Sequence, residues 1–120
     1  MKKFFDISEA EQEVMEKLWE QEDSIKQPQL LALFEADGKE WKRQTLNTFL
    51  SRLEDKGLVE RENRMVRAIY SKEEFNYMQM KAAIDHMYEG HLSNLVAAFA
   101  RKKKIDESEA QELIRILEDN

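Results

Sequence analysis

The sequence contains no cysteine, and this absence removes several kinds of chemistry at once. Without thiols the chain has no disulfide framework, no thiol nucleophile and no thiolate metal site. Sensing of copper or zinc through cysteine ligands is therefore excluded.

Proline and glycine are also scarce, with one proline and three glycines in 120 residues, while 37% of the residues are charged. Turn-rich sheet proteins need more glycine and proline than this, so the composition favours a mainly α protein. A chain of this length can bury one modest core. Alternatively, it can form a small module with a helical extension whose apolar face is covered by a second chain.

Long apolar runs are missing as well, and none approaches the roughly 20 residues that span a bilayer. The opening segment becomes acidic at Asp6 instead of continuing into the apolar part of a signal peptide. We therefore expect a soluble, cytoplasmic protein that has no membrane partner.

The side-chain sets that mark common enzymes are not found in the sequence. There is no glycine-rich phosphate loop, no Ser-His-Asp set and no pair of acids in an apolar setting. The two histidines, His86 and His91, lie five residues apart across Gly90, so they do not share the i, i+4 helix face that metal ligation prefers. The sequence predicts no catalytic residues, no metal site and no cofactor.

Two helix starts are marked early in the chain. Ser8-Glu9-Ala10-Glu11 has the pattern of a capping box and predicts a helix from about Ser8 to Glu20. Pro28 suits the first turn of a second, short helix, which Asp37-Gly38 ends.

The third segment, from Trp41 to Lys56, has two different sides at helical spacing. Its apolar side consists of Leu46, Phe49, Leu50 and Leu53. The opposite side carries Gln44, Asn47, Thr48 and Ser51, and it is flanked by Arg43, Thr45 and Arg52. Uncharged hydrogen-bonding groups with flanking cations suit base edges and phosphates, because Gln and Asn can pair with adenine and Thr can meet a thymine methyl. A merely polar amphipathic helix is the alternative reading.

A small hairpin is predicted after this helix. Gly57 ends the helix, residues 58–61 alternate like a strand, and residues 62–64 turn into a second strand over residues 65–70. Three helices followed by a β-hairpin is the order of a winged helix-turn-helix. From Trp41 to Arg67 the sequence has seven Lys or Arg against four acids, although the whole chain has a net charge of −6. The basic residues gather where nucleic acid would bind.

The remaining sequence again predicts helices, over residues 72–89, around residues 92–99, and from a cap at Asp106. Three short amphipathic helices bury little apolar surface alone, so they fold back on the first module or associate with a second copy. We favour association, and predict a winged-helix DNA-binding domain over residues 1–72 and a helical dimerisation domain over residues 73–120. The predicted homodimer contacts are Met78, Ile84, Met87, Leu92, Leu95, Phe99, Leu113 and Leu117.

Residues 7–20, 41–62 and 75–119 resemble the penicillinase repressors, the BlaI/MecI family, across nearly the whole chain. The resemblance rests on the Ile-Ser-x-Ala-Glu opening, the Trp before the third helix, a Thr-x-x-Thr-x-Leu-x-Arg-Leu-x-x-Lys-Gly core and a Leu-Val-x-x-Phe segment. It implies a homodimeric transcription repressor that binds an inverted repeat, controls β-lactamase or penicillin-binding-protein genes and is inactivated by a protease.

This chain departs from the family pattern in two places. The copper-responsive CopY branch carries C-terminal cysteines, which this chain lacks, so release by copper through that route is excluded. The Asn-Phe pair that is cut in the antibiotic-responsive repressors aligns with Ala98-Phe99, which is the possible cleavage site here. The basic run at residues 101–104 reads as a solvated linker that a protease could also enter.

For the DNA interface, the residues and the resemblance together lead to a definite prediction. Major-groove contacts are assigned to the start and outer face of the third helix, and Arg64 at the hairpin tip is assigned to phosphate or the minor groove. The major-groove set is Lys42, Arg43, Gln44, Thr45, Thr48 and Arg52. The sequence leaves two alternatives open: control of metal, transport or other stress genes without cysteine-based sensing, and a winged helix that binds protein instead of DNA.

Overall fold

The computed structural model describes residues 6–120, and its backbone contacts divide the chain into two units, Met1–Met80 and Lys81–Asn120. Residues 1–5, on which the expected lack of a signal peptide partly rests, lie outside the described residues. Of the described helices, none is both long enough and apolar enough to cross a membrane.

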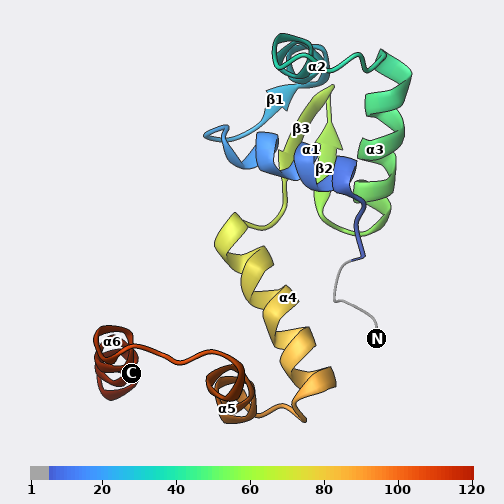
Figure 1. The fold of residues 1–120 in the computed structure, drawn as a ribbon. Coiled ribbons are helices and arrows are strands. Elements are labelled where there is room, and N and C mark those ends of the chain that lie inside the picture. The colour runs from blue at the N-terminus through green and yellow to red at the C-terminus, as the bar shows by residue number, and fades with distance from the viewer. Residues whose placement is uncertain (1–5) are drawn as a thin grey trace. The chain divides into compact units, whose positions relative to one another are not determined.

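The first unit is a winged helix-turn-helix, as the sequence predicts (Figure 1). Its elements, in chain order, are α1 (Glu9–Trp19), β1 (Ile25–Lys26), α2 (Gln27–Ala36), α3 (Arg43–Asp55), β2 (Val59–Glu62) and β3 (Met65–Ala68), followed by the start of α4 (Lys72–Met87). The predicted capping box is confirmed: Ser8 Oγ accepts from the Glu11 amide at 3.1 Å, and Glu11 Oε1 accepts from the Ser8 amide at 2.8 Å.

The sheet has one more strand than the predicted hairpin. Its order is β1-β3-β2, and all pairs are antiparallel, with Val66 of β3 opposite both Ile25 and Arg61. β1 has only two residues, which is too short for the alternation that marks a strand in a sequence. Its existence depends on pairing with β3, so local sequence did not predict it.

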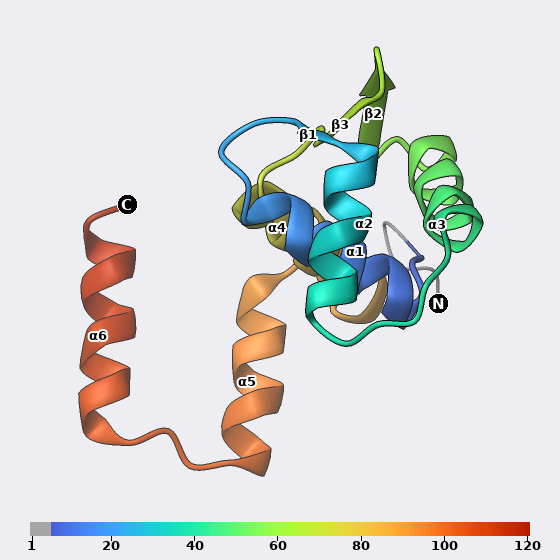
Figure 2. The ribbon, with the colours of Figure 1, turned by 90° about the horizontal axis from the view of Figure 1, so that it is seen from above.

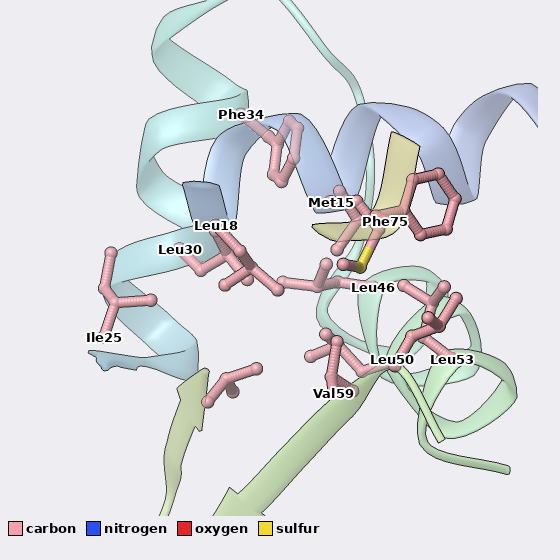
Figure 3. Close-up of a cluster of buried hydrophobic side chains, with 13 residues drawn as sticks. Met15, Leu18, Ile25, Leu30, Phe34, Leu46, Leu50, Leu53, Val59 and Phe75 are labelled. Carbon is pink, nitrogen blue, oxygen red and sulfur yellow. The ribbon is translucent and has the colours of Figure 1, made fainter. Parts of the chain in front are cut away.

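The core of the first unit lies between α1, α2, α3 and one face of the sheet (Figure 3). Leu46, Leu50 and Leu53 of α3 are fully buried, and truncating such a side chain to alanine typically costs about 2–5 kcal/mol. The other buried apolar residues are Val14, Met15, Leu18, Ile25, Leu30, Phe34, Leu58, Val59, Val66 and Phe75. This packing fixes the angle at which α3 presents its opposite, polar side.

The end of α3 determines where the wing begins. Gly57 has φ +78°, a backbone conformation that residues with a Cβ rarely adopt. The amide of Leu58 donates to the carbonyl of Leu53 at 2.9 Å. The helix therefore ends at Gly57, as predicted, and the chain turns there and enters β2 beside α3.

The second unit contains the end of α4, α5 (Leu92–Lys102) and α6 (Glu107–Glu118). The predicted cap of the last helix is confirmed, because Asp106 Oδ1 accepts from the Glu109 amide at 2.8 Å. Within this unit the ribbons of α5 and α6 stand apart in both views (Figures 1 and 2).

The division after Met80 lies beyond the predicted domain boundary at residues 72–73. Phe75 explains the difference, because this residue of α4 is buried in the core of the first unit and its ring lies 5.4 Å from that of Trp19. The part of α4 from Lys72 to Met80 thus belongs to the winged-helix unit.

Candidate nucleic-acid interface

The outer face of α3 presents most of the predicted DNA-binding residues to solvent. Lys42, Arg43, Gln44, Thr48 and Arg52 are exposed. Thr45, the sixth residue of the predicted set, is half-buried. Because the buried leucines fix the opposite side of the helix, these side chains lie on a surface whose orientation the core determines.

Thr48 makes a hydrogen bond within α3 that limits what it can offer a ligand. Its Oγ1 donates to the Gln44 carbonyl at 3.0 Å. The hydroxyl proton is thus in use, and the γ-methyl group and the oxygen lone pairs are left for a partner. A threonine in this state suits an apolar contact with a thymine methyl.

Arg64 lies at the tip of the wing, where the backbone has an unusual conformation. Asn63 and Arg64 have φ +53° and +67°, as the two central residues of a type I′ hairpin turn require. The Arg64 carbonyl accepts from the Gln27 amide at 3.1 Å, which ties the wing tip to the start of α2. The exposed Arg64 side chain is therefore carried on an anchored turn.

Residues distant in sequence line two open clefts near the starts of α2 and α3, one of which also includes the wing tip. One cleft is lined by Gln27, Pro28, Arg43 and Arg64, and the other by Gln27, Arg43, Gln44 and Asn47. The structure thus brings together Arg43, Gln44 and Arg64, which the sequence had assigned to DNA from two separate segments. Gln27 was not predicted as a site residue. Pro28, the next residue, predicted the start of a helix. No feature of the neighbouring sequence predicted that this helix start would lie beside Arg43 and Arg64.

Neither α2 nor α3 has a side-chain cap at its N-terminus in the described structure. Their N-cap residues are Lys26 and Lys42, and the first turn of each helix contains no acidic residue. In α2 the Gln27 amide already donates to the Arg64 carbonyl and Pro28 has no amide hydrogen, so the first-turn amides that remain available to water or to a ligand are chiefly those of α3. No carboxylate in either first turn cancels the positive potential at these helix ends.

Arg61 of β2 connects the wing to α3. Its Nη1 donates to Asn47 Oδ1 at 2.8 Å, and its Nη2 donates to Ser51 Oγ at 3.0 Å and to Glu54 Oε1 at 2.8 Å. The hydrogen bond that the guanidinium donates to Glu54 holds the pKa of that carboxyl below its ordinary value. The polar-side residues Asn47 and Ser51 are thus already bound by protein, whereas the sequence pattern treated them like Gln44 and Thr48.

The apolar residues predicted to form the dimer are not buried within one chain. Met78, Ile84 and Leu95 are half-buried, and the others are exposed, including Phe99 at 50% and Leu117 at 64%. Of the described residues in α5 and α6, none is buried. Ala98 and Phe99, the possible cleavage site, lie inside helix α5.

The histidines lie outside this interface, and both are exposed. Within residues 6–120, no three His, Cys, Asp or Glu side chains form a group that could hold a metal ion.

Comparison with known proteins identifies the family. The family model described as penicillinase repressor matches residues 7–119. The chain belongs to the penicillinase repressor family. It is therefore a transcription repressor that binds DNA, and the resemblance seen in the sequence is confirmed.

Individual relatives of this penicillinase repressor family member match along almost their whole length. The chain is 30% identical to a protein named penicillinase repressor from Bacillus licheniformis, over all of this chain and 95% of that protein. It is 28% identical to the methicillin resistance regulatory protein MecI of Staphylococcus aureus strain N315, over 96% of this chain and 95% of the relative. These relatives are regulatory proteins, not enzymes.

Proposed function

We propose that this repressor binds an inverted-repeat operator as a homodimer, with α3 in the major groove and the wing tip on the flanking backbone. The observation that carries the proposal is the convergence of Arg43, Gln44 and Arg64 beside two open clefts at the start of α3. A protein-binding face would more often present aromatic anchors than this set of amides, hydroxyls and cations.

Within this interface the side chains have different tasks. Gln44 and Thr48 read base edges, because an amide can pair with adenine in two places and a methyl group can contact thymine. The cations Lys42, Arg43, Arg52 and Arg64 hold phosphates, which position the helix without reading sequence. The half-buried Thr45 has the smallest share of this surface.

Dimerisation through the second unit supplies the second half-site. The exposed apolar side chains of α5 and α6 need a cover that residues 81–120 of one chain do not provide. A second copy provides this cover symmetrically and places two copies of α3 on successive turns of one face of DNA. Affinity then depends on both half-sites, which is why an inverted repeat is needed.

The names of the relatives suggest the regulated genes. Because relatives are described as penicillinase and methicillin resistance regulators, we propose that this repressor controls antibiotic-resistance genes of the β-lactamase or penicillin-binding-protein type. Cleavage at Ala98-Phe99 by an inducing protease relieves repression by removing the end of α5 and all of α6 from the dimer. Because proteases bind extended chain, α5 must unwind locally before it is cut.

The DNA-binding part is tested by fluorescence anisotropy on duplexes that the full-length protein selects from a randomised inverted-repeat library. Thr48→Ala is expected to cost about 1–3 kcal/mol and to relax preference at one base pair. Arg52→Ala is expected to weaken binding to all duplexes and to lower the salt dependence of binding. If both variants bind the selected duplex as tightly as the parent, the interface is assigned wrongly.

Lys72→Ala is the matched control for the loss of a cation. Lys72 starts α4, is exposed and pairs with Glu16 at 2.9 Å, so it lies at the end of β3 opposite to the wing tip. We expect this variant to keep the parent's affinity and salt dependence. A loss equal to that of Arg52→Ala would show that overall charge, and not the proposed surface, sets the affinity.

A further inference from the structure

The guanidinium of Arg61 spans two turns of α3. Its three partners, Asn47, Ser51 and Glu54, are spaced by four and three residues, so they form one row along the helix. A planar guanidinium with several fixed donors can satisfy such a row at once, which the single ammonium group of lysine cannot do.

The contact with Arg61 determines how Asn47 is presented to a ligand. A free asparagine offers an acceptor and two donors, and pairing with adenine in two places uses both kinds of group. Here Oδ1 is turned toward Arg61 at 2.8 Å, so the Nδ2 donors point away from the guanidinium. Asn47 is exposed and lines the cleft that also contains Arg43 and Gln44, where those donors can meet an acceptor.

The contact with Arg61 likewise leaves Ser51 as a hydrogen-bond donor toward a ligand. Its Oγ accepts from Arg61 Nη2 at 3.0 Å, which leaves its own hydroxyl proton for donation. Gln44 differs from both residues, because its side chain has no protein partner in the described part of the chain and keeps both kinds of hydrogen-bonding group. The polar side of α3 thus contains one amide that can rotate and one that is held.

We propose that Arg61 is a specificity-positioning residue, which restricts two-point adenine recognition to Gln44 by holding Asn47 in a donor-only orientation. This inference rests on the proposed DNA-binding function of α3. It predicts that the base pair facing Asn47 presents an acceptor, such as guanine O6 or N7 or thymine O4. Arg61 acts on the operator through Asn47 and needs no contact with DNA.

The experiment measures the affinity of full-length protein for every single-base-pair substitution of the duplex selected by the parent. Arg61→Lys keeps the positive charge but releases Asn47, so the relative affinity for adenine at one position is expected to rise about fivefold or more. The salt dependence is expected to stay at the parent's value, because no phosphate contact is lost. In the Asn47→Ala background, Arg61→Lys is expected to leave base preference unchanged.

Arg67→Lys is the matched control. Arg67 lies on β3 and pairs with Glu60 on the neighbouring strand, and its register places it on the sheet face away from Arg61. It should keep the parent's base preferences, and thermal unfolding of every variant reports folding separately.

Two results would overturn the inference while leaving the proposed function intact. One is an unchanged base preference in Arg61→Lys, or the same change with and without Asn47. The other is a uniform loss of affinity for all duplexes with a lowered unfolding midpoint, which would show a purely structural role for Arg61. Failure of the parent protein to select any inverted repeat would overturn the proposed function and this inference together.

Discussion

Glu11 joins two helices from inside the first unit. Among the described residues it is the buried carboxylate, with 2% of its surface exposed. Its Oε1 accepts from the Ser8 amide and from Lys56 Nζ, both at 2.8 Å, so it caps α1 and also holds the end of α3. A residue that the sequence shows only as part of a capping box therefore also holds the end of α3.

This arrangement predicts a pH-dependent contribution to stability. Burial raises the pKa of Glu11, but the hydrogen bonds from Lys56 and the Ser8 amide outweigh it, so the pKa lies below its ordinary value. A lowered pKa in the folded state stabilises the protein above the unfolded-state pKa of about 4.3, and this stabilisation is lost as pH falls through the folded-state pKa.

Glu11→Gln is accordingly expected to lower the free energy of unfolding at neutral pH by about 1–3 kcal/mol. The difference from the parent should shrink as pH falls below about 4. Urea unfolding at a series of pH values measures it. Glu13→Gln, which loses only a surface ion pair with Lys39, is the control and should cost under about 1 kcal/mol. A Glu11→Gln difference that is constant across this pH range would contradict the assignment.

Among the secondary-structure elements, the wing combines local backbone strain with a proposed role in DNA binding. A positive φ is costly for residues that carry a Cβ, and Arg64 adopts one at the hairpin tip. The pairing of β2 with β3 and the Gln27–Arg64 hydrogen bond hold this conformation. Glycine would fit the backbone better at this position, so the arginine side chain is better explained by binding than by stability.

Arg64→Gly separates these two roles. We expect its unfolding midpoint to equal or exceed that of the parent, because glycine adopts positive φ without strain. Its affinity for all duplexes should fall, and the slope of log affinity against log salt should decrease in magnitude by about one. Asn63→Gly changes the same turn without loss of charge and should keep the parent's affinity. Unchanged DNA binding in Arg64→Gly would remove the wing tip from the interface.

For the molecule as a whole, the contrast between its two units is the main feature. The described residues of the first unit enclose a core of buried side chains, whereas α5 and α6 contain no buried residue among those described. A helical segment with its apolar residues exposed gains little stability from its own packing. The second unit is therefore expected to become stable through association.

Analytical ultracentrifugation tests this expectation. The full chain should be a dimer at micromolar concentration, and a fragment ending at residue 80, which retains Phe75 and its core, should be a monomer. Leu117→Asp should weaken the dimer, since Leu117 is 64% exposed on α6. Leu33→Asp, on an exposed position of α2, is the control and should leave it intact. A monomeric full chain, or a fragment that dimerises equally well, would rule out this dimer.

The sequence by itself determined the helices, their caps and the winged-helix order. The signals at Ser8, Gly57 and Asp106 act over three to five residues, and the alternation of apolar and polar positions on α3 repeats within one turn. Helix caps and periodicity depend on residues that are neighbours in the chain. The sequence pattern therefore contains the interactions that form these elements.

Only the tertiary structure decided which distant residues meet. The strand β1 exists because β3 pairs with it. Phe75 belongs to the first unit because it packs against Trp19 and the rest of the core. The hold of Arg61 on Asn47 joins a strand to a helix, and the cleft brings Gln27 to Arg43 and Arg64. These contacts depend on how the helices and strands pack against one another. The residue types within one segment do not specify which distant residue will contact it.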